Sequence, residues 1–174
     1  DERVRDQHRL LLGPWDHSAY YNKRPTCAGE RDFGPDVLTG PDVLADIAFQ
    51  WFDHWLRGEG DGFLPESKIR YFQMGENVWD EIDSWPPPHT AVPYYLHSAG
   101  RANSRMGDGV LSTQPPGSEP PDGYVYDPFD PVPTRGGRSM IDVLPGVENQ
   151  AQVEERQDFL VYSTPRLADP VAIT

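Results

Sequence analysis

The sequence has little of what disulfide scaffolds, metal sites and membrane helices require. Its 174 residues include a single cysteine, Cys27, which has no intrachain partner for a disulfide. A zinc motif such as HExxH is absent, and His8, His89 and His97 have no second ligand at metal spacing. No apolar stretch approaches the roughly 18 residues that a membrane-spanning helix needs. We therefore expect a protein without metal or cofactor, in a reducing, cytoplasmic compartment.

Basic residues are also scarce. Lysine and arginine number 15 against 28 aspartate and glutamate residues, which gives a net charge of −13. A chain without a basic face is a poor partner for nucleic acid or for an anionic membrane surface, so we expect neither. Hydrophobic residues make up 37% and aromatics 11%, which is too apolar for a disordered chain. Glycine (16) and proline (19) are abundant, which favours many turns and argues against a helical bundle.

Two segments in the first half of the chain have clear patterns. Leu10 to Leu12 form a short apolar run that ends at Gly13-Pro14, as is typical of a strand buried on both faces of a parallel sheet. A helix is predicted over about 42 to 57, with Asp42 as its N-cap and Gly58 as its C-terminal stop. The apolar residues of this helix follow helical spacing: Leu44, Ile47, Ala48, Trp51 and Trp55.

The second half of the chain has the pattern of a β-sandwich. Short runs rich in Tyr, Phe and Val alternate with turn residues, at 68–74, 91–96, 124–126, 158–163 and 170–174. Trp85-Pro86-Pro87-Pro88 is the predicted linker, because successive X-Pro bonds favour an extended backbone. We therefore place one domain at residues 1–84 and a second, mostly β, at 85–174.

His17 is the residue best placed for chemistry. It follows the carboxyl end of the predicted strand, where ligands and catalytic groups gather in open α/β sheets, and imidazole titrates near neutral pH. The alternative is a loop histidine bonded to a backbone carbonyl. No serine here has a G-x-S-x-G context, since Ser98 and Ser139 each lack one of the glycines. Asp6 lies at the other end of the strand, too far away to orient the imidazole.

Several longer motifs give a family resemblance. They are LLLGPWDHS (10–18), FDHWLRGEGDG (52–62), RYFQMGENVWDEIDSWPPP (70–88) and YVYDPFDPVPTRGG (124–137). In this order they resemble the CocE/NonD family, which comprises cocaine esterase, X-Pro dipeptidyl-peptidase and α-amino-acid ester hydrolase. The resemblance implies a serine hydrolase with an α/β-hydrolase domain, an inserted helical cap and a galactose-binding-like jelly roll.

The resemblance also assigns roles to residues. His17 matches the catalytic histidine of a Ser-His-Asp triad, and Trp15 matches the neighbouring aromatic residue at the acyl site. The nucleophilic serine, the triad aspartate and the oxyanion-hole tyrosine lie upstream in the family, and the jelly roll continues downstream. The implied chain is thus an α/β-hydrolase fragment, its last strand and helix, followed by an incomplete jelly-roll sandwich. The implied substrate is a small-molecule ester or an X-Pro peptide.

Two other functions remain open from the sequence. One is a non-catalytic, galactose-binding-like sandwich whose tyrosines (Tyr94, Tyr95, Tyr124 and Tyr126) form platforms for a carbohydrate or a partner protein. The other is a truncated product without activity of its own. Assembly into a homo-oligomer is left open as well, and the sequence does not separate an esterase from a dipeptidyl-peptidase.

Overall fold

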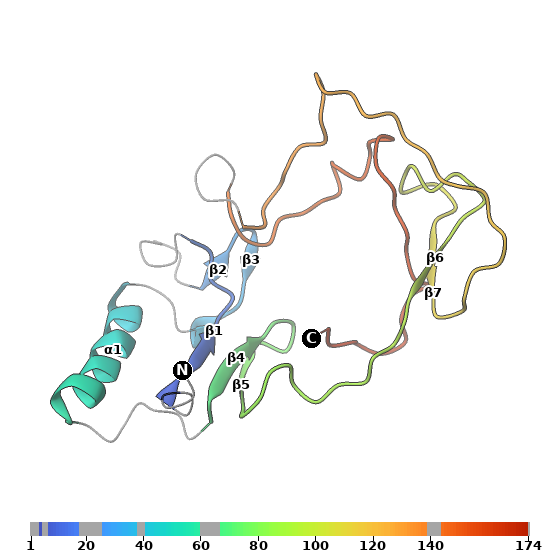
Figure 1. Cartoon of the computed structure of the whole chain (residues 1–174). Coiled ribbons are helices and arrows are strands. Elements are labelled where there is room, and N and C mark those ends of the chain that lie inside the picture. The colour runs from blue at the N-terminus through green and yellow to red at the C-terminus, as the bar shows by residue number, and fades with distance from the viewer. Residues whose placement is uncertain are drawn as a thin grey trace. The chain divides into compact units, whose positions relative to one another are not determined.

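The computed structural model describes residues 4, 7–17, 26–37, 41–59, 67–138 and 144–173. The chain divides into two compact units, the first formed by residues 1–87 and 135–148, the second by 88–134 and 149–174 (Figure 1). The first change of unit falls between Pro87 and Pro88, within the predicted linker. Residues 135–148 belong to the first unit, whereas the predicted second domain is continuous. The identification of the two units as named domains stays a prediction.

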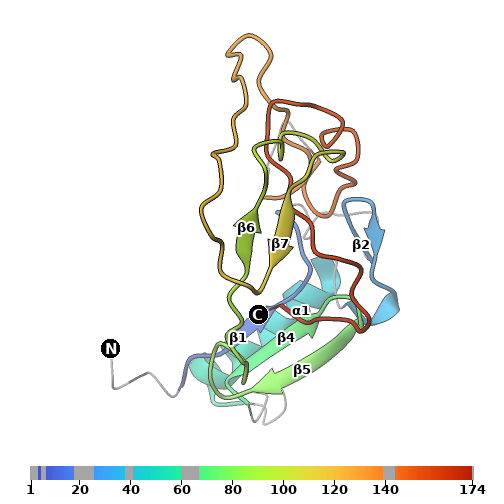
Figure 2. The ribbon, with the colours of Figure 1, turned by 90° about the vertical axis from the view of Figure 1, so that its right-hand side faces the viewer.

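A three-stranded sheet organises the first unit. Its order is β1 (Leu10–Leu12), β4 (Ile69–Gln73) and β5 (Val78–Ile82), with β1 parallel and β5 antiparallel to β4 (Figure 2). Parallel strands require a long crossover connection, and here the connection from β1 to β4 contains the helix. The predicted strand at Leu10–Leu12 is therefore confirmed, and the unit has α/β connectivity.

The burial predicted for β1 is wrong. Leu10 and Leu12, which share one face of the strand, are 43% and 36% exposed. Among the described strands β1 has a single hydrogen-bonded neighbour, β4, so it lies at a sheet edge rather than in the middle of a covered sheet. The described part of the chain also leaves the face with Leu10 and Leu12 partly uncovered, unlike a strand buried on both faces.

The predicted helix forms, with one change at its start. α1 (Pro41–Phe52) continues into a wider helical turn, η4 (Asp53–Arg57), and Gly58 ends it with φ 69°. Asp42 is not the N-cap, because the helix already begins at Pro41; the Asp42 carboxylate lies in the first turn instead, near the positive end of the helix dipole. No helix in the described part of the chain is long and apolar enough to cross a membrane.

A small core lies beside the sheet. A hairpin of β2 (Cys27–Ala28) and β3 (Arg31–Asp32) leads into the single turn η3 (Pro35–Val37). The side chains of Ala28, Phe33, Val37 and Phe72 are buried together, with Trp79 packed against them. Neither the β2–β3 hairpin nor β5 was predicted from the sequence.

Val147 is hydrogen-bonded to the β2–β3 hairpin through the backbone. The Glu30 N–H donates to the Val147 carbonyl at 2.8 Å, and the Val147 N–H donates to the Ala28 carbonyl at 3.3 Å. Between these bonds lies Gly29, with φ 63°. A Cβ at Gly29 would lie 2.3 Å from the Val147 carbonyl oxygen, so only glycine allows this approach.

All regular secondary structure described in the second unit is β. β6 (Tyr95–His97) and β7 (Val110–Ser112) pair antiparallel, side by side in Figures 1 and 2. A later segment runs beside them. The Val161 N–H donates to the carbonyl of Ala102 at 2.8 Å, and the Ser163 N–H to that of Gly109 at 3.2 Å.

Three predicted strands do not form. The run 158–163 makes the backbone bonds just described and a single parallel bridge to β7, not a continuous ladder. Residues 124–126 and the described part of 170–174 pair with no described strand. Tyr124, Val125 and Tyr126 are 53%, 82% and 62% exposed, so aromatic content alone did not produce a packed strand. Strand preference depends on a neighbouring strand and on burial, and both are missing at residues 124–126 and at the described part of 170–174.

The close approach at Gly29 gives a first prediction. Gly29→Ala should lower the free energy of unfolding by about 1–3 kcal/mol, because the new methyl group meets Val147 backbone atoms at a positive φ. Urea unfolding of the protein measures this change. Gly117→Ala is the control, since Gly117 has no positive φ and open space around it. Equal stabilities of the two variants would contradict the account.

Candidate functional site

The candidate histidine lies in a loop at the carboxyl end of β1. Residues 13–17 follow directly on Leu12, the last residue of the strand. His17 is exposed, and Trp15 is half-buried. Among the described residues, the His17 imidazole has no hydrogen bond or ion pair. The alternative weighed from the sequence, a hydrogen bond from the ring to a backbone carbonyl, is not present among the described residues.

Trp15 connects this loop to the core. Its indole N–H donates to the Val37 carbonyl at 3.3 Å, and its ring centroid lies 5.9 Å from that of Trp79. The loop folds back tightly, since a Cβ at Gly13 would lie 2.3 Å from the Trp15 indole. The structure thus gives Trp15 a clear packing role, and its predicted place at the acyl site stays a prediction.

No serine–histidine pair occurs within the described residues. Ser98 donates its hydroxyl to Asp122 at 2.6 Å, not to an imidazole. Asp6 and Ser139, both weighed as triad members from the sequence, lie outside the described residues. His54, in the helical turn η4, is half-buried with its ring edge-on to Trp55 at 4.9 Å.

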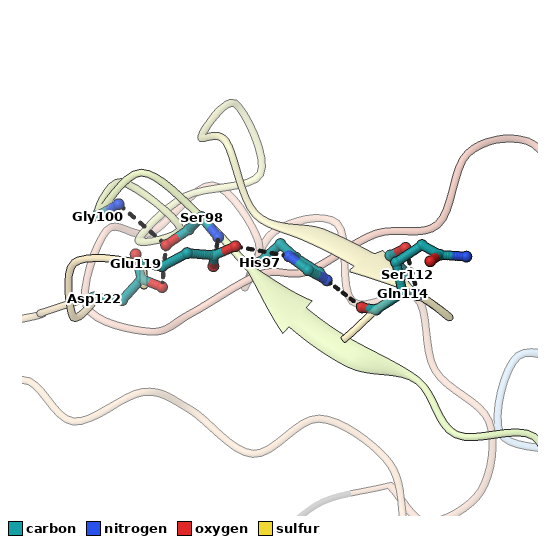
Figure 3. A network of polar contacts seen from close by, with 7 residues as sticks. All are labelled: His97, Ser98, Gly100, Ser112, Gln114, Glu119 and Asp122. Carbon is teal, nitrogen blue, oxygen red and sulfur yellow. Dashed lines mark hydrogen bonds and ion pairs between the residues drawn. The ribbon is translucent and has the colours of Figure 1, made fainter. Parts of the chain in front are cut away.

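A second polar cluster lies in the second unit, at the end of β6 (Figure 3). The His97 imidazole lies between two oxygens, Glu119 Oε1 and the Gln114 carbonyl, each 2.8 Å from a ring nitrogen. The other Glu119 oxygen accepts the Ser98 N–H at 3.1 Å. The Gln114 carbonyl can only accept, so Nε2 donates to it; when Glu119 is ionised, Nδ1 donates as well, and the imidazolium is the form that donates from both nitrogens.

The Asp122 carboxylate accepts three hydrogen bonds in the same cluster. Besides the Ser98 hydroxyl, it accepts the Ala102 N–H at 2.9 Å and the Tyr162 hydroxyl. Ala102 is fully buried, so this carboxylate satisfies a backbone donor that water does not reach. Asp122 thereby holds β6, the following loop and the segment 161–163 together.

These contacts shift the pKa values of the groups involved. The hydrogen bond to Glu119 raises the pKa of His97, and the same bond lowers the pKa of Glu119. The Ser98 and Tyr162 hydroxyls lower the pKa of Asp122, and the bond to Asp122 raises the pKa of Tyr162 to about 12. These shifts favour the charged forms of His97 and Glu119, and the cluster joins segments of the second unit rather than pairing a nucleophile with a base.

Sequence reasoning missed this cluster, although a signal was present. Glu119 and Asp122 flank Pro120-Pro121, a stiff pair that fixes the directions of two carboxylates. Tyr162 lies 40 residues beyond Asp122, and nothing local indicates that contact.

An open pocket of about 800 Å³ lies in the second unit. Its polar wall is fixed by Arg156, whose guanidinium donates to the carboxylates of Asp130 and Asp158. Tyr124, one of the tyrosines expected as a platform, lines the pocket. Within the part of the chain that the structure describes, no three His, Cys, Asp or Glu side chains gather in a way that could hold a metal ion.

Comparison with known proteins decides the family. Residues 61–174 match the family of X-Pro dipeptidyl-peptidase C-terminal non-catalytic domains. The chain belongs to this family. It is also 39% identical over 168 residues to cocaine esterase from Rhodococcus sp. (strain MB1 Bresler). That alignment covers 95% of the chain and 29% of the esterase, so the chain spans under a third of this relative's length. The resemblance to the CocE/NonD family is confirmed.

The fold of this chain is similar to that of a solved structure. It superposes with a TM-score of 0.62 on the crystal structure of an aminopeptidase from the marine sediment archaeon Thaumarchaeota archaeon, at 24% identity. The match covers 92% of this chain and 25% of the aminopeptidase. At this identity the likeness concerns the fold alone. His17 precedes residues 61–174 and so lies outside the non-catalytic domain match.

The His97–Glu119 pair makes stability depend on pH. The folded state holds the imidazolium more tightly than the unfolded chain does, so the stabilisation is complete below the unfolded pKa of about 6.5. It is lost as pH rises through the higher folded pKa. Urea unfolding should therefore show that the wild type loses stability between pH 5.5 and pH 9, and that His97→Gln loses less. His89→Gln, at an exposed histidine of the same unit, should behave like the wild type. A pH dependence of stability that is unchanged in His97→Gln would show that the His97–Glu119 pair does not cause it.

Proposed function

We propose that this chain is the C-terminal part of a serine hydrolase and that His17 is its general base. The observation that carries this proposal is the position of His17. It is exposed in the turn that follows the carboxyl end of β1, a strand parallel to β4 with a helical crossover between them. Catalytic groups of open α/β sheets gather at this edge. The 39% identity to a protein named cocaine esterase supports the same reaction class.

In the proposed reaction His17 serves both halves of an acyl transfer. Its imidazole accepts the proton of a serine hydroxyl as that oxygen attacks an ester or X-Pro amide carbonyl. It then returns the proton to the leaving alcohol or amine. In the second half it takes a proton from water, which attacks the acyl-enzyme, and gives that proton back to the serine. The serine and the triad aspartate are proposed to lie in parts of the protein outside these 174 residues.

The proposal extends to the fold of each unit. We assign the first unit to the end of an α/β-hydrolase domain, supported by the β1–α1–β4 crossover. We assign the second to a jelly-roll domain, supported by its β6–β7 pair and by the family match, whose residues 61–174 also include β4 and β5 of the first unit. The proposed substrates are small-molecule esters or X-Pro peptides. A cytoplasmic location and a homo-oligomeric state stay predictions.

Substitution of His17 tests the proposed function. In the full-length protein, His17→Ala should lower kcat/KM for a p-nitrophenyl ester by about 10³-fold or more, because acylation loses its base. The exposed side chain makes few core contacts, so the unfolding midpoint should stay the same. His89→Ala, at another exposed histidine, is the control and should keep wild-type activity. Activity of His17→Ala within about tenfold of the wild type would refute the assignment.

A second function is favoured by the pocket of the second unit. We propose as the alternative that this unit binds a saccharide, with the half-exposed Tyr124 ring as a platform and Asp158 as a hydrogen-bond acceptor. Ligand-observed NMR of the full-length protein with galactose tests it. Saturation transfer that disappears in Tyr124→Ala but persists in Tyr94→Ala supports the alternative. No transfer to galactose in the wild type argues against it.

A further inference from the structure

Two tryptophans donate to neighbouring carbonyls of one turn. The Trp79 indole N–H donates to the Asp36 carbonyl at 2.6 Å, and the Trp15 indole N–H donates to the Val37 carbonyl at 3.3 Å. Both carbonyls belong to η3, a single helical turn at Pro35–Val37. The two rings lie 5.9 Å apart with their planes at 50°. Strand β5 and the loop of residues 13–17, which we call the histidine loop, are thus both hydrogen-bonded to one turn.

Trp79 is the fixed member of this pair. It lies on β5 opposite Phe72 of β4, and the two rings meet edge to face at 5.3 Å. The Arg70 guanidinium lies over the Trp79 ring, 5.2 Å from its centroid. Phe72 is buried and meets Phe33 edge to face at 5.9 Å. The strand pairing and these ring contacts hold the Trp79 indole from several directions.

Trp15 is the dependent member. It lies in a loop rather than on a strand, and its described side-chain contacts are the Val37 carbonyl, the Trp79 ring and the close approach to Gly13. Gly13 belongs to the same loop, so the described hydrogen bond and ring contact of Trp15 outside this loop are those to the Val37 carbonyl and the Trp79 ring. His17 follows two residues later in an exposed turn. The location of the imidazole therefore depends on where Trp15 is held.

We infer that Trp79 is a positioning residue for His17, acting through Trp15 and the Asp36–Val37 carbonyl pair. The inference rests on the proposed function, since it concerns the base of that reaction. A shift of about 1 Å in a catalytic group can cost on the order of 10²-fold in rate. Trp79 touches neither substrate nor reacting atoms. Its loss should affect the catalytic step and leave substrate binding nearly unchanged.

The test uses three variants of the full-length protein and p-nitrophenyl ester turnover. Trp79→Leu removes both the ring contact and the N–H donor, and should lower kcat by about 10- to 100-fold with KM within about twofold. Trp79→Phe keeps an aromatic ring against Trp15 without the N–H donor, so its kcat should lie between Trp79→Leu and the wild type. Trp85→Phe is the matched control, because Trp85 packs edge to face on Tyr71 at 5.6 Å, outside the Trp15 contact. Its kcat should equal that of the wild type.

Two further readouts separate positioning from simple loss of folded protein. Titration of the nucleophile with a fluorophosphonate counts folded sites, so kcat is expressed per competent site. The pH profile of kcat/KM reports the apparent pKa of the base, and a displaced imidazole should shift it in Trp79→Leu but not in Trp85→Phe. A lower number of sites with unchanged kcat per site and an unchanged pH profile would overturn the inference, leaving Trp79 a structural role only.

Failure of this inference differs from failure of the proposed function. If His17→Ala is inactive and Trp79→Leu keeps wild-type kcat per site, the positioning role is wrong and the general base stands. If His17→Ala keeps its activity, the proposed function itself is wrong, and Trp79 has no base to position.

Discussion

The edge-to-face contact between Phe72 and Trp79 is the interaction on which the first unit depends. It joins β4 to β5 at a distance of 5.3 Å and brings the Trp79 ring to Trp15 on one side, while the Phe72 ring meets Phe33 on the other. Aromatic pairs of this kind add about 0.5–1.5 kcal/mol each beyond the area they bury. Few side chains are buried among the described residues of this unit, so these ring contacts are what links the sheet to Phe33, after the β2–β3 hairpin, and to the histidine loop.

The second unit is held together in a different way. Its only buried hydrophobic residue among those described is Ala102, so a large apolar core is not what orders it. Instead, Glu119 and Asp122 accept hydrogen bonds from His97, Ser98, Ala102 and Tyr162. Carboxylates with several donors are strong acceptors, and they fix loops that hydrophobic burial leaves free. A charged pair between His97 and Glu119 makes this order sensitive to pH, whereas the aromatic row of the first unit is not.

Local patterns predicted the elements that depend on local sequence. The apolar run Leu10–Leu12 and the helical spacing around Trp51 gave β1 and α1 within a few residues, because strand and helix periodicity are properties of neighbouring residues. β5 was missed because its exposed Asp80 and Glu81 interrupt the apolar alternation that indicates a strand. The runs 124–126 and 170–174 were predicted as strands from composition, and the structure provides no partner for them.

In the candidate site, too, local features could be predicted from the sequence and long-range contacts could not. His17 was singled out by its place after the strand at Leu10–Leu12 and Trp15 by the family resemblance, so the position of the loop after β1 was predictable. The bond from Trp79 to Asp36 spans 43 residues, and that from Tyr162 to Asp122 spans 40. Such pairs are set by how strands and loops fold together, and no spacing rule within the sequence indicates them.

Fluorophosphonate labelling of the full-length protein, followed by mass spectrometry, tests the central claim most directly. The account predicts one labelled serine outside residues 1–174, and a labelling rate that falls by about 10³-fold in His17→Ala because the serine has lost the base that activates it. Labelling of a serine within these residues, or a rate unchanged by the substitution, would contradict the assignment of His17 as the base of a serine hydrolase.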